Sequence, residues 1–301
     1  GLSGAESTVG WPLTAGGQPL GVLLLAWTEP QPLDNAQRAF ISAVATMVSQ
    51  ALVRARIYSD EHARAAVLQS AVLPSSPAET PDLDVCVTYE PADVSHGLGG
   101  DWYDVMSLPG DRTYLAVGDV VGHGLAAVED MAQLRAAGRA LAHHGLAPAQ
   151  LLAELNGFTR DASHGRFATM AVAIFDRNDG SLSYCTAGHP PPLFRRSATG
   201  VVSRLSDAHG PVLGPVRDTR YAESRIQVGI GDILMLYTDG LVERHARDIE
   251  TGIATAERTL ADWNPATGVS RNCGLLRELL STRNRADDVC VAVVRFIGTE
   301  C

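Results

Sequence analysis

The sequence predicts an α+β fold, and three observations support this prediction. Short apolar runs typical of strands follow one another in meander order, with turn signals between them. The helical stretches are grouped and do not alternate with the strands, which disfavours a parallel βαβ fold. A helical pattern of up to roughly 40 residues, without Pro or Gly, precedes the strand-rich part.

The bulk composition indicates a soluble globular protein, since 46% of the 301 residues are hydrophobic and 19% are charged. A net charge of −10 argues against nucleic acid as a partner, because phosphate backbones require a basic surface. The five cysteines are scattered without a C-x-x-C pair, which favours a reducing compartment. The longest apolar stretch, Leu20 to Trp27, is too short to span a bilayer, and no signal peptide is visible. We therefore expect a cytoplasmic protein without a membrane partner.

The first 33 residues contain one clear strand, Pro19–Trp27. From Asp34, a candidate N-cap, apolar residues recur at helical spacing as far as Leu73. Two interpretations of this helix stay open. It either carries a signal and a dimer contact, or it packs on its own domain with a break near Tyr58 to His62.

The prolines at positions 74, 77 and 81 mark the boundary to the strand-rich part. Eight strands are expected after it: Asp84–Tyr89, Tyr114–Asp119, Phe167–Asp176, Leu182–Thr186, Val201–Leu205, Glu223–Val228, Ile233–Thr238 and Val289–Phe296. Helices are expected at Gly124–His144, Pro148–Ala162 and Ala254–Trp263, with a weaker one at Cys273–Ser281.

Four aspartates lie where predicted strands begin or end. Asp119 and Asp239 follow apolar strands, Asp287 precedes the last strand, and Asp101 follows two glycines that let the backbone approach closely. Taken singly, each is explained most simply as a turn or cap residue. Taken together, carboxylates brought from strand ends to one point form an all-oxygen site of the kind that holds Mg²⁺ or Mn²⁺. The pattern therefore indicates metal-assisted hydrolysis.

The motifs around these aspartates resemble the metal-dependent Ser/Thr protein phosphatases (PPM family), in the bacterial SpoIIE/RsbU-like branch. The matching strings are Gly99-Gly100-Asp101-Trp102-Tyr103-Asp104, Gly118-Asp119-Val120-Val121-Gly122-His123-Gly124, Arg166-Phe167-Ala168-Thr169-Met170, Thr186-Ala187-Gly188-His189-Pro190, Gly231-Asp232, Thr238-Asp239-Gly240 and Ala286-Asp287-Asp288. The resemblance extends from about Leu73 to Phe296. It implies a four-layer α-β-β-α sandwich of two antiparallel sheets flanked by helices, with a metal site at one edge.

The resemblance also implies roles for individual residues. Asp119 is expected to bridge two or more Mn²⁺ or Mg²⁺ ions, with the carbonyl of Val120 as a further ligand. Asp101 is expected to bind one ion, and Asp239 and Asp287 the other. Asp119 and Asp239 are the residues on which we expect catalysis to depend. The neighbouring acids at positions 104 and 288 either support these ligands, directly or through water, or are turn residues.

Two departures from the animal branch of the family concern the chemistry. Val121 stands where that branch has a proton-donating histidine, and His123, two residues further on, is either a proton donor or a loop residue. No Lys or Arg lies between Arg64 and Arg112, so no arginine just upstream of the first aspartate is available to hold the phosphate. His189, which precedes prolines, is expected to be a structural turn residue.

The front of the chain resembles the C-terminal part of a GAF sensor domain, on strings such as Trp11-Pro12-Leu13 and Gly17-Gln18-Pro19-Leu20. The expected organisation is a GAF-like segment at 1–57, a linker helix at 58–73 and a phosphatase domain at 74–297. The resemblance implies hydrolysis of phosphoserine or phosphothreonine on an anti-sigma-factor antagonist (STAS) protein, controlled by the sensor, with a homodimer contact through the helix at 34–73. Two alternatives stay open: a catalytically inactive phosphoprotein-binding pseudophosphatase, and a hydrolase of small phosphate esters.

Overall fold

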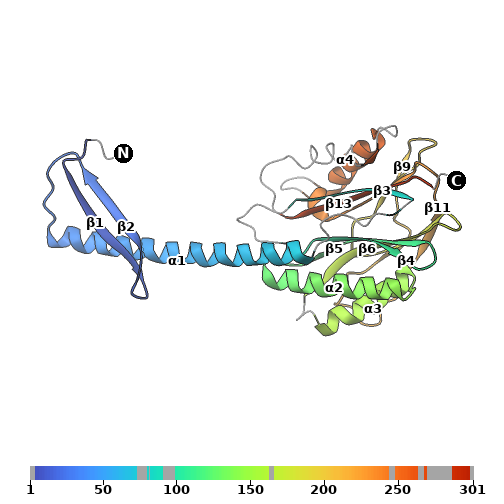
Figure 1. The fold of residues 1–301 in the computed structure, drawn as a ribbon, viewed down its shortest axis with the longest axis horizontal. Coiled ribbons are helices and arrows are strands. Elements are labelled where there is room, and N and C mark those ends of the chain that lie inside the picture. Colours follow the sequence, from blue (N-terminus) through green and yellow to red (C-terminus); the bar gives the residue numbers. More distant parts are fainter. Residues whose placement is uncertain are drawn as a thin grey trace. The chain divides into compact units, whose positions relative to one another are not determined.

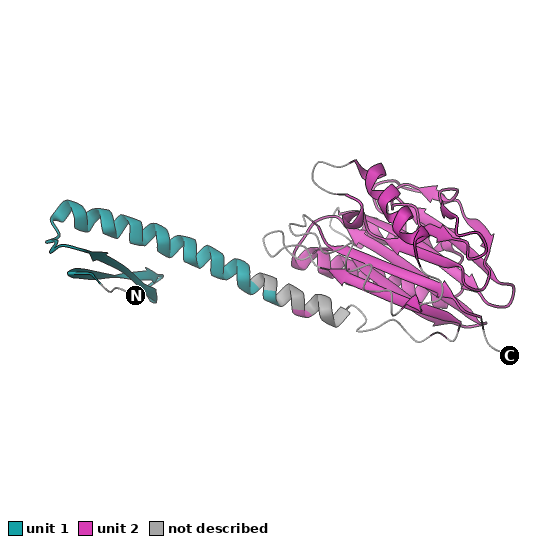
Figure 2. Ribbon diagram, turned by 90° about the horizontal axis from the view of Figure 1, so that it is seen from above, with its two compact units in different colours: residues 1–63 teal, residues 64–301 magenta. Residues whose placement is uncertain are grey.

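The computed structural model describes residues 4–72, 80, 82–90, 99–162, 166–243, 248–263, 268–269 and 287–298. The chain divides into two units, Gly1–Ala63 and Arg64–Cys301, which are coloured separately in Figure 2. The weak helix expected at Cys273–Ser281 and the proline-marked boundary at residue 74 lie outside the described residues.

The first unit begins with an antiparallel hairpin of β1 (Ser7–Ala15) and β2 (Gln18–Trp27). Gly16 and Gly17 close it with φ angles of 56° and 79°, a conformation that glycine adopts without strain. Only the second strand was predicted, because Gly10 and Pro12 interrupt the strand pattern of the first.

Helix α1 (Asn35–Val72) follows, and its 38 residues confirm the predicted long helix without the break considered near residue 58. Asp34 caps it as predicted, and the cap is reciprocal. The Asp34 carboxylate accepts the Gln37 amide at 2.7 Å, while the Gln37 side chain accepts the Asp34 amide at 3.0 Å. The four-residue spacing of the buried Ile41, Ala45 and Ser49 places them on one face of the helix.

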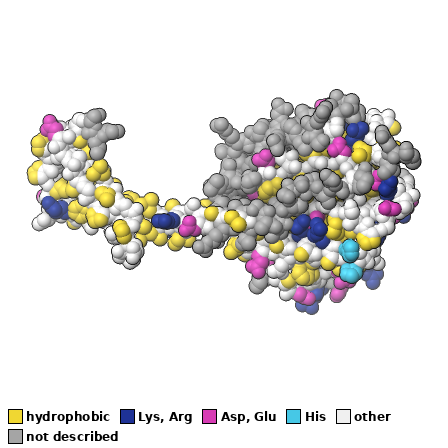
Figure 3. Space-filling model, in the orientation of Figure 1, with side chains coloured by type: hydrophobic (Ala, Val, Ile, Leu, Met, Phe, Trp, Pro, Cys, Tyr) yellow, Lys and Arg dark blue, Asp and Glu magenta, His cyan; other side chains and the backbone are white. Residues whose placement is uncertain are grey.

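Other faces of α1 expose large apolar side chains, and Figure 3 shows hydrophobic groups spread over this unit. Phe40 and Met47 are each 70% exposed. Among the described residues, Asn35–Asp60 is the one stretch long and apolar enough to cross a membrane, with 17% of its apolar window buried. Only the uninterrupted apolar run Leu20 to Trp27 was considered from the sequence, and this helix was not identified as a candidate; core helices of soluble proteins meet the same criterion.

The second unit contains two sheets (Figure 1). The first sheet runs in the order β10-β7-β6-β5-β4, and β11 also pairs with β7. Its strands are β4 (Trp102–Leu108), β5 (Arg112–Val120), β6 (Ala168–Asp176), β7 (Ser181–Ala187), β10 (His209–Gly210) and β11 (Ser224–Gln227). Their pairings are antiparallel except for the parallel contact of β10 with β7.

The second sheet has five strands in the order β3-β13-β12-β8-β9, with antiparallel neighbours throughout. Its strands are β3 (Leu83–Glu90), β8 (Leu193–Arg195), β9 (Val202–Arg204), β12 (Ile233–Tyr237) and β13 (Val289–Phe296). All eight strands expected from the sequence are present within these two sheets, whereas β4, β8 and β10 were not predicted.

The side-chain alternation of the strands separates three apolar cores. Leu234 and Leu236 of β12 face the other sheet and pack in a cluster with Leu115 of β5. Ile233 and Met235 face the opposite way, toward α4 (Ile249–Ala261). A third cluster joins the first sheet to α2 (Leu125–His143) and α3 (Pro148–Ala162). The helices thus cover the outer faces of the two sheets, which confirms the α+β class.

The cysteines differ in state. Cys86 on β3 is disulfide-bonded, whereas Cys185 and Cys290 are buried free thiols. The scattered positions of the cysteines did not predict this bond.

Candidate functional site

The first pair of predicted site residues, Asp101 and Asp119, lies at the paired ends of β4 and β5. The last paired residues of these antiparallel strands are Trp102 and Gly118. Asp101 precedes Trp102 and Asp119 follows Gly118, so the two aspartates lie side by side. The Val120 amide donates to the Gly100 carbonyl at 3.2 Å. A Cβ on Gly100 would lie only 2.4 Å from the Val120 oxygen, so a residue with a side chain could not hold this approach.

The second pair, Asp239 and Asp287, comes from the other sheet. Asp239 begins the 3-10 turn Asp239–Leu241 shortly after β12, and Asp287 stands two residues before β13. Gly240 lets these segments meet, because a Cβ there would lie 2.0 Å from the Asp288 carbonyl oxygen. All four aspartates therefore lie at strand ends, as the sequence predicted.

Buried polar contacts fix the surroundings of the pairs. Asp101 is 1% exposed and accepts the hydroxyl of the fully buried Thr238 at 2.7 Å. Asp288 is fully buried and accepts the Gly99 amide at 3.1 Å and the hydroxyl of Tyr89. Asp288 therefore anchors the segment that leads into Asp101.

The carboxylates act on one another electrostatically. Burial, followed by the negative charges of Asp239 and Asp287, raises the pKa of Asp119 from its usual 3.8 to about 7. Burial and then the charge of Asp239 help to raise the pKa of Asp287 to about 6, against the opposing hydrogen bond from the next amide. The pKa of Asp101 is raised well above its usual value, first by burial and then by Asp119. The pKa of Asp239 is raised by burial and by Glu243.

These shifts have a common cause: burial and mutual repulsion disfavour the charged carboxylates, and among the described residues no arginine contributes to their pKa values. Oxygen donors gathered with uncompensated charge suit a hard divalent cation, so the residues fit Mg²⁺ or Mn²⁺ in kind. Within the described part of the chain, however, no three His, Cys, Asp or Glu side chains stand close enough together to enclose an ion. Coordination would require these side chains to close around the ion.

Asp104 has a different environment from the one considered for it. Its carboxylate is buried on β4 and forms ion pairs with Arg139 at 2.6 Å and Arg135 at 3.2 Å, both on α2. It shares the strand face of Trp102, which packs in the cluster beneath the helices. Asp104 therefore fastens a helix to the sheet, and its contacts give no sign of a supporting role beside the ligands.

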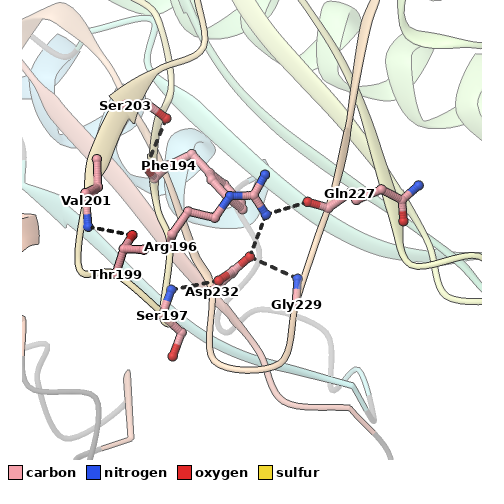
Figure 4. A network of polar contacts seen from close by, with 9 residues as sticks. All are labelled: Phe194, Arg196, Ser197, Thr199, Val201, Ser203, Gln227, Gly229 and Asp232. Carbon is pink, nitrogen blue, oxygen red and sulfur yellow. Dashed lines mark hydrogen bonds and ion pairs between the residues drawn. The ribbon is translucent and has the colours of Figure 1, made fainter.

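Asp232, in the matched Gly231-Asp232 string, is also structural. Its carboxylate accepts the amides of Ser197 at 2.7 Å and Gly229 at 2.9 Å and pairs with Arg196 at 3.0 Å. Figure 4 shows these contacts converging on the carboxylate. Asp232 precedes β12, whereas Asp239 follows it, so the two acids serve opposite ends of the strand.

The two histidines of the matched motifs, His123 and His189, have different surroundings. His123 is exposed, and its backbone pairs with that of Gly99. The next residue, Gly124, is the N-cap of α2 and has no side chain with which to cap the helix. His189 is 2% exposed, with Nδ1 at 2.7 Å from the Thr169 hydroxyl and Nε2 at 3.0 Å from the Tyr237 carbonyl. Burial lowers the pKa of His189 to about 4. The prediction of a structural role for His189 agrees with these contacts.

Sequence reasoning missed the roles of Thr238 and Tyr89, which contact the acids from distant segments. Thr238 lies beside a predicted ligand in the sequence, so its position was visible although its bond was not. The role of Arg166, which precedes β6, was also not predicted. Its guanidinium donates to the Asp130 carboxylate of α2 at 2.6 Å and to the Ala126 carbonyl at 3.3 Å. These contacts hold the start of α2 next to the loop that follows Asp119.

A family model, Stage II sporulation protein E (SpoIIE), matches residues 109–297. The chain belongs to the SpoIIE family. It carries a PP2C-type phosphatase domain of the SpoIIE/RsbU branch, as its motifs predicted. Asp119, Asp239 and Asp287 lie inside the matched range, and Asp101 lies just before it.

Curated relatives support this assignment. Phosphoserine phosphatase RsbU of Bacillus subtilis (strain 168) is 27% identical over 180 residues, which are 60% of this chain and 52% of that protein. Phosphoserine phosphatase RsbP of the same organism is 26% identical over 154 residues, which are 50% of this chain and 38% of that protein. The chain therefore spans about half or less of the length of these relatives.

Solved structures agree on the fold. The structure of the RsbU and RsbW domains of Rv1364c from Mycobacterium tuberculosis matches with a TM-score of 0.68 and 31% identity, covering 76% of this chain and 64% of that one. The SiaA-PP2C domain of Pseudomonas aeruginosa matches with a TM-score of 0.65 and 20% identity, covering 81% of this chain and 98% of that one. The second match supports the fold alone.

Proposed function

We propose that this protein is a metal-dependent phosphoprotein phosphatase that hydrolyses phosphoserine or phosphothreonine. The observation that carries the proposal is the electrostatic coupling of Asp119 to Asp101, Asp239 and Asp287, which brings together strand ends of two sheets in a SpoIIE-family domain. The names of RsbU and RsbP, both phosphoserine phosphatases, favour a phosphoserine substrate.

We assign the predicted ligand roles to the same residues. Asp119, with the Val120 carbonyl beside it, would be the ligand shared between the ions, Asp101 would hold one ion, and Asp239 and Asp287 would hold the other. The side-by-side position of Asp101 and Asp119 and the charge coupling of Asp119 to Asp239 support this division. Two or more Mn²⁺ or Mg²⁺ ions, when bound, would supply an activated water and polarise the phosphoryl oxygens.

The chain's own residues contribute orientation and charge. Thr238 holds the Asp101 carboxylate in place, and Asp288 holds the preceding Gly99 amide. The pKa of about 7 means that the Asp119 carboxyl is partly protonated near neutral pH, and a bound cation would displace that proton. The side chain of Val121 carries no transferable proton, so it cannot protonate the leaving group.

The remaining parts of the proposal concern context. The sheets and helices of residues 74–297 form the four-layer α-β-β-α sandwich, 58–73 is the linker helix, and 1–57 is the C-terminal part of a GAF-like sensor domain. We place a homodimer contact on the 34–73 helix, which exposes Phe40 and Met47. The substrate is a phosphorylated STAS-domain anti-sigma-factor antagonist, and the site of action is the cytoplasm.

The test is hydrolysis of a phosphoserine-bearing STAS protein and of a chromogenic phosphate ester, with Mn²⁺ and with a chelator. We expect Mn²⁺-dependent turnover of the phosphoprotein in preference to the small ester. Asp119→Asn and Asp239→Asn should each lower turnover by at least about a thousandfold, because metal ions supply several kcal/mol of transition-state stabilisation. Asp232→Asn, outside the cluster, serves as the matched control. Full activity of the folded Asp119 or Asp239 variant would contradict the metal assignment.

A further inference from the structure

The two carboxylate pairs belong to different sheets. Asp101 directly precedes β4, and Asp119 lies near the end of β5. Asp239 follows β12, and Asp287 precedes β13. Between the sheets lies an apolar cluster, and apolar contacts are non-directional. Such packing alone would not fix the spacing of two pairs that repel each other.

Thr238 crosses this gap with a directional bond. The Cys290 amide donates to Thr238 Oγ1 at 2.8 Å, so the strand β13 fixes the threonine oxygen. The hydroxyl proton then has two acceptors within reach, Asp101 Oδ2 at 2.7 Å and the Cys290 carbonyl at 3.4 Å. The shorter bond, to a carboxylate, is the stronger one. Thr238 therefore ties the second sheet to the first carboxylate pair.

His189 makes a parallel connection one residue earlier. The Tyr237 carbonyl only accepts, so the Nε2 that lies 3.0 Å from it must carry the proton. The neutral ring then has a free lone pair on Nδ1, which accepts the Thr169 hydroxyl at 2.7 Å. Thr169 is the cross-strand partner of Asp119, and Tyr237 precedes Asp239 by two residues.

We propose that Thr238 and His189 are positioning residues that form an inter-sheet clamp behind the acidic cluster. The clamp consists of the Thr238–Asp101 bond and the Thr169–His189–Tyr237 chain. Both connections end on consecutive residues, Tyr237 and Thr238, immediately before Asp239. The clamp sets the separation of the two carboxylate pairs and thereby the affinity for divalent cations. This inference rests on the metal site of the proposed function.

Matched variants separate the hydroxyl from the volume of Thr238. Thr238→Val keeps the shape and removes the bond, whereas Thr238→Ser keeps the bond and removes a methyl group. We expect calorimetric titration of metal-free protein to show Mn²⁺ binding weakened at least tenfold in Thr238→Val, about what a hydrogen bond to a charged group supplies. Thr238→Ser should bind nearly as the wild type does.

The His189 arm is tested through Thr169, which is not a proposed ligand. Thr169→Val should weaken Mn²⁺ binding several-fold, and Thr169→Ser should restore it. Thr159→Val removes a buried hydroxyl bond within α3, from Thr159 to the Leu155 carbonyl at 2.7 Å, and controls for lost stability alone. A second measure is the rise in unfolding temperature on adding Mn²⁺, which should shrink in Thr238→Val and stay normal in Thr159→Val.

Each outcome decides a separate question. Wild-type affinity in both folded valine variants at positions 238 and 169 would overturn the clamp while leaving the metal site intact. Weak binding in Thr159→Val equal to that in Thr238→Val would overturn it as well, because stability would then explain the effect. Failure of the wild type itself to bind Mn²⁺ would overturn the proposed metal site and the clamp together.

Discussion

Asp101 directly precedes β4 and Asp104 lies within it, three residues later. Both are almost completely buried, yet their surroundings are opposite. Asp104 faces α2 and forms ion pairs with Arg135 and Arg139. Asp101 lies next to Asp119, and burial followed by the charge of Asp119 raises the pKa of Asp101. Among the residues that the structure describes, arginines supply the counter-charge for Asp104, whereas none forms an ion pair with Asp101.

This difference separates structure from function. A buried carboxylate with its own arginines stabilises packing and has no need of a ligand. A group of carboxylates without such partners costs folding free energy until a cation binds. Charge that a fold leaves unpaired in its interior therefore marks the place where an external partner is expected.

The largest expected effect comes from breaking the paired region. Asp104→Ala leaves two arginines without their buried partner and should lower the free energy of unfolding by about 2–4 kcal/mol. Urea denaturation of metal-free protein measures the loss. Asp161→Ala, which breaks the exposed pair with Arg160, is the control and should change stability by less than about 1 kcal/mol. The Mn²⁺ affinity of the folded Asp104 variant should match that of the wild type. A loss of Mn²⁺ binding in this variant would contradict a purely structural role for Asp104.

A smaller effect of opposite sign is expected in the unpaired region. Asp119→Asn removes one repelling charge and should raise the metal-free unfolding free energy by about 1–2 kcal/mol, less than the full pKa shift implies because the side chain is partly exposed. With Mn²⁺ the order should reverse, since only the wild type gains stability from the ion. A metal-free Asp119→Asn protein that is less stable than the wild type would contradict the view that this charge is uncompensated.

The smallest expected effect is a pH dependence. The folded-state pKa values of Asp119 and Asp287, about 7 and about 6, exceed the usual aspartate value of 3.8. The folded state therefore holds protons that the unfolded chain releases, so these groups favour folding at low pH, and this contribution is lost as pH rises through about 6 to 7. Urea denaturation in chelator should show this decline, and Asp119→Asn should flatten it. An unchanged slope in that variant would assign the dependence to other groups.

Much of the site could be predicted from the sequence because its parts are local. Each aspartate stands next to an apolar strand, and β13 was predicted at its observed bounds since all its residues but one are apolar. The cap of α1 was predicted from Asp34 for the same reason. The SpoIIE match followed from motifs that keep these local features together.

The parts that could not be predicted depend on distant contacts. Strand β4 contains Asp104, and the arginines that make this acid acceptable in a core lie on a helix more than 30 residues away. Helix α4 begins at Ile249, earlier than predicted, because Gly252 weakens the helical pattern. Gly252 is required because a Cβ at this position would lie 2.0 Å from the Val242 carbonyl oxygen. This close approach cannot be recognised in the sequence.

The decisive measurement is a calorimetric Mn²⁺ titration of the metal-free wild type and its Asp119→Asn variant, in two buffers of different ionisation enthalpy. We predict binding of two or more ions to the wild type near neutral pH, accompanied by proton release from the aspartates, and loss of both in the variant. Absence of binding in the wild type, or identical binding and proton release in the variant, would contradict a metal centre built from the unpaired aspartates.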